Sequence, residues 1–132
     1  MKSKVYFSRE ISPAKLVELY EALGRKAEGN VAIKLSTGEP GGHNFLQPAL
    51  IGDLVRKLNG TIVECNTAYE GARDTTKRHL QLFQDHGWTK YFPVDLLDAQ
   101  GPDLELAIPN GKKIQKNFVG KDIVNYDSTL IL

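Results

Sequence analysis

Cysteine is almost missing from this sequence, and so are long apolar runs and an excess of charge of either sign. The 132 residues include one cysteine, Cys65, which excludes a disulfide within the chain and is compatible with a reducing compartment. Lysine plus arginine number 17 against 16 for aspartate plus glutamate, so bulk charge does not favour a nucleic-acid partner. No segment approaches the roughly 20 apolar residues of a membrane span. We therefore predict a cytoplasmic protein with no nucleic-acid and no membrane partner.

Hydrophobic residues at 41% and charged residues at 25% are typical of a globular domain, and the length fits one α/β domain over residues 1–132. Short apolar or β-branched runs predict strands near residues 4–8, 31–35, 61–65, 92–97 and 128–132, with a weaker candidate at 104–108. Residues 112–126 indicate no single element.

Helical periodicity separates the predicted strands. One helix begins at Pro13, behind a capping Ser12, and another at Pro48. The second helix ends at Asn59-Gly60, where glycine is available for a left-handed cap. A third helix begins at residue 75 or 76. This alternation predicts a three-layer α/β fold, with a mainly parallel sheet of four to five strands and helices on both faces.

The last predicted strand, residues 127–132, is apolar and ends the sequence. Because a domain rarely ends on an apolar strand, we expect the chain to be truncated at this end relative to longer relatives. An uncovered strand edge recruits other chains. We therefore also predict a homo-oligomer that forms through this C-terminal edge.

A glycine-rich loop, residues 36–45, follows the second predicted strand and is the most informative stretch of the sequence. Three glycines and Pro40 exclude a regular element there. Ligands of open α/β proteins bind in loops at the carboxyl ends of strands. The loop at residues 66–73 follows the next strand and should meet the first loop at the same sheet edge, near Glu64 and Asp98. The alternative is a connection that is merely polar.

Polar residues and glycines of these loops, with the start of the next helix, form the predicted ligand site: Thr37, Gly38, Glu39, Gly41, Gly42, His43, Asn44, Asn66, Thr67, Arg73, Thr75 and Thr76. Arg73 and the positive end of that helix favour a small polar or anionic ligand, such as a carboxylate or phosphate. The common phosphate-binding fingerprints are absent.

Candidate metal ligands are Glu39, His43 and Cys65, although no pair of them has diagnostic spacing. Cys65 is also a candidate nucleophile, and lone cysteines are more often small buried hydrophobic residues. His79, inside the third helix, has either a packing role or a place in the site. The spacing assigns no catalytic residue.

Three motifs resemble one known family: Thr37-Gly38-Glu39-Pro40-Gly41-Gly42, Glu64-Cys65-Asn66-Thr67-Ala68-Tyr69, and Arg73-x-Thr75-Thr76-x-x-His79. The sequence is similar, from Val5 to Leu132, to the domain-of-unknown-function family 362, the uncharacterised iron–sulfur-centre proteins. The resemblance implies that this chain is the N-terminal α/β part of such a protein. It implies [4Fe–4S] clusters only for full-length relatives, and no cofactor in this chain, because one cysteine cannot supply four thiolates.

Two functions follow as hypotheses. The first is the α/β domain of an iron–sulfur redox protein of unknown reaction, with a polar ligand site in the loops after the second and third predicted strands. The second is a non-enzymatic module that binds a small anion or a partner through the same loops. A chain that keeps only the fold is a third possibility.

Overall fold

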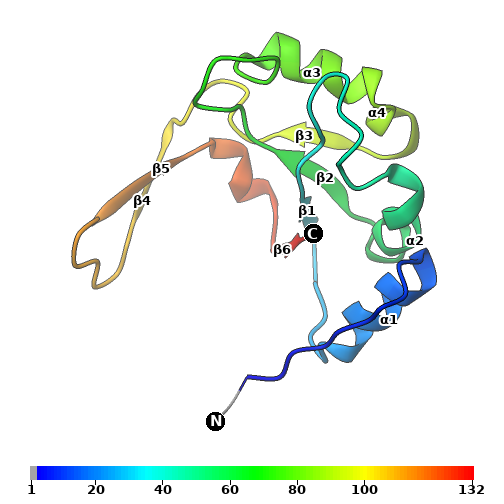
Figure 1. Cartoon of the computed structure of the whole chain (residues 1–132). Helices are drawn as coiled ribbons and strands as arrows, with labels where there is room; N and C mark the ends of the chain where they lie inside the picture. Colours follow the sequence, from blue (N-terminus) through cyan, green and yellow to red (C-terminus); the bar gives the residue numbers. More distant parts are fainter. Residues whose placement is uncertain (1–2) are drawn as a thin grey trace.

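A computed structural model describes residues 3–132. In chain order its elements are α1 (Pro13–Ala22), β1 (Val31–Lys34), α2 (Pro48–Leu58), β2 (Thr61–Glu64), α3 (Thr76–Asp85), α4 (Trp88–Tyr91), β3 (Val94–Leu96), β4 (Leu104–Ala107), β5 (Lys116–Val119), the 3-10 helix η1 (Lys121–Asn125) and β6 (Ser128–Ile131). Figure 1 shows their arrangement.

Four parallel strands form the main sheet, in the order β3-β2-β1-β6. Ala32 of β1 lies opposite Thr61 of β2 on one side and Thr129 of β6 on the other. The predicted mainly parallel sheet is therefore confirmed, with four strands. After β3 the chain returns across the sheet to place β6 beside β1, so the strand order reverses at the β1–β6 pair.

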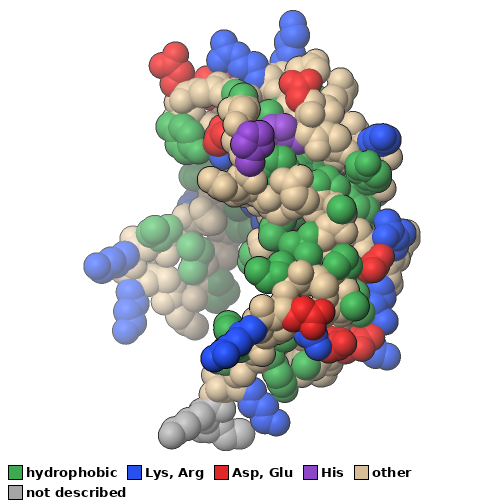
Figure 2. All heavy atoms as spheres, turned by 45° about the vertical axis from the view of Figure 1, so that its right-hand side comes forward, with side chains coloured by type: hydrophobic (Ala, Val, Ile, Leu, Met, Phe, Trp, Pro, Cys, Tyr) green, Lys and Arg blue, Asp and Glu red, His purple; other side chains and the backbone are tan. Residues whose placement is uncertain are grey.

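The α-helices gather over one face of the sheet (Figure 1). Ile33 of β1 and Ile62 of β2 are fully buried there, against Phe83 of α3 and Trp88 of α4. Figure 2 shows hydrophobic side chains across the middle of this side of the molecule. None of the helices within residues 3–132 is long and apolar enough to cross a membrane.

The other face of the sheet is covered near β2 and β3 by η1. Ile123 and Tyr126 pack against the buried side chains of Ala32 and Val63. Tyr126 Oη donates a hydrogen bond of 2.9 Å to Asp95 of β3, which fixes η1 to the sheet. Helical turns therefore lie on both faces, as predicted, with the α-helices on one and the 3-10 helix on the other.

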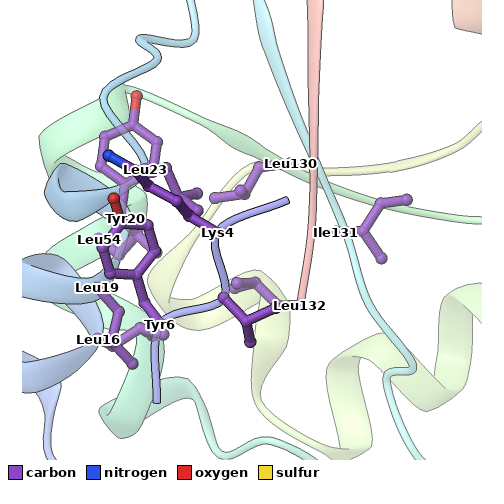
Figure 3. Close-up of a pocket in the computed structure, with 11 residues that line it drawn as sticks. Lys4, Tyr6, Leu16, Leu19, Tyr20, Leu23, Leu54, Leu130, Ile131 and Leu132 are labelled. Atoms are coloured by element: carbon purple, nitrogen blue, oxygen red, sulfur yellow. The ribbon is translucent and has the colours of Figure 1, made fainter. Parts of the chain in front are cut away.

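The strand predicted at residues 4–8 is wrong. This segment forms no element, and the side chains of Val5 and Phe7 are 88% and 82% exposed. It passes α1 and β6 instead, where Tyr6 and Leu132 line an apolar cavity of about 340 Å³ (Figure 3). Its β-branched and aromatic composition fits a strand, but composition alone supplies no partner edge to pair with.

Residues 104–119 form an antiparallel hairpin apart from the main sheet, with Leu104 opposite Val119 (Figure 1). The weaker strand candidate at 104–108 is thus confirmed as β4. The stretch 112–126, which indicated no single element, contains β5 and η1. The strand predicted at 92–97 is shorter than expected, because β3 spans Val94–Leu96.

Helix ends follow local chemistry. Ser12 Oγ accepts a hydrogen bond of 3.2 Å from the Lys15 N–H, which caps α1 as predicted. At the end of α2 the left-handed residue is Asn59, with φ of 47°. Gly60 is needed for space, since a Cβ atom there would lie 2.5 Å from the side chain of Ile33.

Candidate functional site

Glu64, the last residue of β2, is the centre of a buried polar cluster at the carboxyl edge of the sheet. Its side chain is 6% exposed. Its Oε1 accepts hydrogen bonds from the Thr37 N–H at 3.3 Å and from Arg73 Nη1 at 3.2 Å. Its Oε2 accepts from Lys34 Nζ at 2.7 Å and from the Cys65 N–H at 3.1 Å. Four donors thus hold this carboxylate in place.

Arg73 lies between two carboxylates, and its side chain is 10% exposed. It donates through Nη1 to Glu64, and through Nε and Nη2 to Oε1 of Glu39, with an Nε–Oε1 distance of 2.9 Å. The Tyr69 hydroxyl lies 3.4 Å from the same Glu39 oxygen and 3.3 Å from Arg73 Nη2. The loops after β1 and β2 therefore meet through this ion pair, as their positions in a parallel sheet predict.

The base of the loop after β1 is anchored by two aromatic side chains that follow α3. The carbonyl oxygen of Thr37 accepts hydrogen bonds from His86 Nδ1 at 2.8 Å and from the Trp88 indole N–H at 3.1 Å. Gly38 follows with φ of 96°, and a Cβ atom there would lie 2.5 Å from the ring of Phe45. That ring stacks on His86, with centroids 4.5 Å apart. Glycine is required at this position by both conformation and space.

A second set of bonds joins the loops after β2 and β3 to the start of α3. The Asn66 N–H donates to Asp98 Oδ1 at 2.8 Å. The Asn66 side-chain amide donates to Thr76 Oγ1 at 3.2 Å, and this hydroxyl donates in turn to the Ala99 carbonyl at 2.8 Å. These contacts fix the N-terminus of α3 beside the carboxyl ends of the strands.

Four buried polar side-chain atoms around this edge have no hydrogen-bond partner among the described residues: Thr37 Oγ1, Asn66 Oδ1, and both ring nitrogens of His79. His79 is fully buried and packs against Phe83, with ring centroids 4.7 Å apart. Burial lowers the pKa of His79, although the negative charge of Glu64 acts in the opposite direction. The imidazole is therefore neutral at pH 7.

The structure brings together about half of the predicted site residues. Those in or beside the buried cluster are Thr37, Gly38, Glu39, Asn66, Thr67, Arg73 and Thr76. Gly42 donates its N–H to the Glu39 carbonyl in a turn, while Gly41, His43, Asn44 and Thr75 are exposed. Sequence reasoning missed Lys34. The signal available for it was a charge at the end of an otherwise apolar strand.

The residues present do not fit an iron–sulfur cluster or a firm metal site. Within residues 3–132 no three histidine, cysteine, aspartate or glutamate side chains are grouped to hold a metal ion. Cys65 is half-buried; burial, followed by the negative charge of Asp98, raises the pKa of its thiol. A protonated thiol is a poor ligand and a poor nucleophile. Of the other candidates, Glu39 is paired with Arg73 and His43 is exposed.

Comparison with protein families gives one match, to the model described as Domain of unknown function (DUF362), over residues 31–132. The match begins at β1 and includes both loops of the buried cluster. Comparisons with the curated proteins and with the solved structures gave no significant match. The matched region covers most of the chain, which therefore belongs to the DUF362 family.

Proposed function

We propose that this domain binds a small anionic ligand at the carboxyl edge of its parallel sheet. The observation that carries the proposal is the set of buried polar atoms without partners on Thr37, Asn66 and His79, beside the buried guanidinium of Arg73. Each unsatisfied buried polar group costs about 1–3 kcal/mol. Such groups are rare in folded proteins, and their concentration at one edge supports a binding role.

The position of the cluster supports the same function. In open α/β sheets, ligands bind outside the carboxyl ends of the strands, where the strand order reverses. Here the order reverses between β1 and β6, and Lys34 at the end of β1 is paired with Glu64. The cluster therefore lies at the carboxyl edge next to this reversal.

Arg73 and α3 favour a ligand with negative charge. A guanidinium offers a planar fork that matches carboxylate and phosphate oxygens. The N-cap of α3, Thr75, makes no side-chain hydrogen bond to the first turn, so the positive end of this helix is open to a ligand. The negative charge of Asp74 opposes this attraction, although Asp74 forms an ion pair with Arg78.

Binding is favoured over catalysis by this domain alone. A nucleophile or base is activated when it forms a hydrogen bond to a partner that can take its proton or orient it. The raised pKa of Cys65 keeps its thiol protonated, and the ring nitrogens of His79 have no partner within residues 3–132. The family resemblance suggests a wider setting, in which the domain holds a ligand for an iron–sulfur redox module of longer relatives.

A titration followed by NMR tests this proposal. Acetate or inorganic phosphate is added to the whole chain at constant ionic strength, and backbone amide shifts are recorded. We expect the amides of Thr37, Gly38 and Asn66 to respond in the wild type. The response should be much weaker in Arg73→Gln and unchanged in Arg25→Gln, an exposed arginine after α1 that forms no ion pair among the described residues.

A response that is equal in Arg73→Gln and in the wild type would overturn the proposal. So would the absence of any response in the wild type at millimolar anion. Folding of each variant is checked first by the dispersion of its amide spectrum, and Arg73→Lys, which keeps the charge but not the fork, replaces Arg73→Gln if the latter unfolds.

A further inference from the structure

The two carboxylates that share Arg73 have very different surroundings. Glu64 is 6% exposed and accepts hydrogen bonds on both of its oxygens. Glu39 is 49% exposed, and its bonds to Arg73 and to Tyr69 all involve Oε1. Glu64 is therefore a fixed part of the structure, whereas Glu39 is held only at the tip of its side chain.

The base of the loop is anchored separately from the Glu39 side chain. Gly38 precedes it with φ of 96°, and Gly41 follows within the same turn with φ of 70° and no neighbour within 4 Å of its Cβ position. Thr37 is anchored through its carbonyl oxygen to His86 and Trp88. The Gly42 N–H donates a hydrogen bond of 2.9 Å to the Glu39 carbonyl oxygen and holds this turn. Glu39 would therefore leave Arg73 by rotation of its half-exposed side chain, while Thr37 stays in place.

The charges of the cluster balance only when one carboxylate occupies the outer side of Arg73. Lys34 and Arg73 carry two positive charges, and Glu64 and Glu39 carry two negative charges. If Glu39 moves away, the buried guanidinium has no carboxylate on its Nε and Nη2 edge, where the Tyr69 hydroxyl alone remains. An uncompensated buried charge is strongly unfavourable. A group with one negative charge restores the balance, whereas a doubly charged phosphate adds an excess charge beside Glu64.

We propose that Glu39 is an internal stand-in for the ligand, and that the ligand class is a small monocarboxylate whose carboxylate displaces Glu39 from Arg73. This inference rests on the proposed function, since it concerns the same site. The ligand carboxylate takes the Nε and Nη2 edge of Arg73 and the neighbouring Tyr69 hydroxyl, which now contact Glu39 Oε1. Glu39 keeps the site closed and neutral until the ligand arrives.

Removal of the competing carboxylate tests the inference. The wild type, Glu39→Ala and Glu39→Gln are titrated with acetate and with inorganic phosphate, and the Arg73 Nε–H resonance is followed. The matched control is Glu70→Gln, an exposed glutamate of the loop after β2 with no ion pair among the described residues. We expect acetate to bind about tenfold more tightly to Glu39→Ala than to the wild type, the equivalent of one charge-assisted hydrogen bond.

Glu39→Gln should also bind acetate more tightly, and Glu70→Gln should match the wild type. If the wild type responds to anions and both Glu39 variants bind acetate no more tightly, the stand-in role is wrong while the proposed function stands. If phosphate gains more than acetate from loss of Glu39, the monocarboxylate class is wrong. If neither the wild type nor any variant responds, the proposed function fails together with this inference.

Discussion

Arg73 Nη1 lies 3.2 Å from Glu64 Oε1, and both side chains are at least nine-tenths buried. This ion pair joins the loop after β2 to the last residue of β2 itself. The loop that carries Glu39 reaches the same guanidinium. The geometry of the candidate site therefore depends on a charged network centred on Arg73 and Glu64.

Glu64→Gln should destabilise the protein strongly. The substitution leaves Lys34 and Arg73 buried or half-buried with one negative charge fewer, and breaking a buried pair costs about 3–5 kcal/mol. Urea unfolding gives the change in the free energy of unfolding. The exposed Glu70→Gln should change it by less than about 0.5 kcal/mol. Equal effects of the two substitutions would show that the network does not stabilise the fold.

Gly38→Ala should also lower stability, and by more than Gly41→Ala. Both glycines have positive φ, which costs a residue with a Cβ atom about 1–2 kcal/mol. At Gly38 the added atom also meets the ring of Phe45 at 2.5 Å, whereas at Gly41 the space is open. Thermal unfolding of the two variants measures the difference. A smaller loss for Gly38→Ala than for Gly41→Ala would contradict this account of the loop.

His79 should make stability depend on pH in the range of an ordinary histidine. Burial lowers the pKa of His79 from its usual 6.5, so in this range the unfolded chain binds a proton that the folded chain does not. Stability is therefore full above about pH 6.5 and falls as the pH drops below it. Urea midpoints at about pH 7.5 and pH 5.5 measure the effect, and His79→Leu should reduce it.

The matched control for His79 is His43→Gln, because His43 is exposed. Its pH dependence should equal that of the wild type. A fall in stability between pH 7.5 and 5.5 that is as large in His79→Leu as in the wild type would exclude the buried imidazole as its source.

The outer edge of β6 should promote self-association. Within residues 3–132 this strand pairs only with β1, and Ile131 is 76% exposed on the face away from α1 (Figure 3). Light scattering after size-exclusion chromatography should show a mass that rises with concentration, and Ile131→Lys should reduce it. Ile11→Lys, at an exposed position before α1, is the control. A monodisperse wild-type monomer at high concentration would count against the prediction.

Much of the sheet could be predicted because its strands are short apolar runs separated by periodic helices. The segment at residues 4–8 has the same kind of composition and forms no strand. Pairing requires that the backbone of a segment lie in register beside a strand edge. Here the side chain of Tyr6 lines a cavity with Leu16 of α1 and Leu132 instead, which local sequence does not report. The end of α2 gives a similar lesson. Asparagine and glycine both tolerate positive φ, so the sequence does not tell which residue of Asn59-Gly60 is left-handed. In the structure it is Asn59, and Gly60 lies where a Cβ atom would meet the side chain of Ile33.

The convergence of the two loops could be predicted, because parallel strands end at one edge. The partners within the cluster could not. The sequence predicts that Arg73 binds an external anion, whereas in the structure its guanidinium pairs with Glu39 and Glu64. His43 was a candidate ligand by residue type, and in the structure it is exposed, outside the buried cluster. Residue type indicates which chemistry a side chain can perform, whereas the partners that it contacts depend on the fold.

The most direct measurement of the central claim is a crystal structure of the chain soaked with 4-bromobenzoate, a monocarboxylate whose aryl bromide does not alkylate side chains, so that the anomalous signal of bromine locates the anion. We expect a bromine peak beside the Arg73 guanidinium, with the carboxylate on its Nε and Nη2 edge and Glu39 moved outward. Peaks only at exposed lysines, with Glu39 still on Arg73, would contradict an anion site at the carboxyl edge of the sheet.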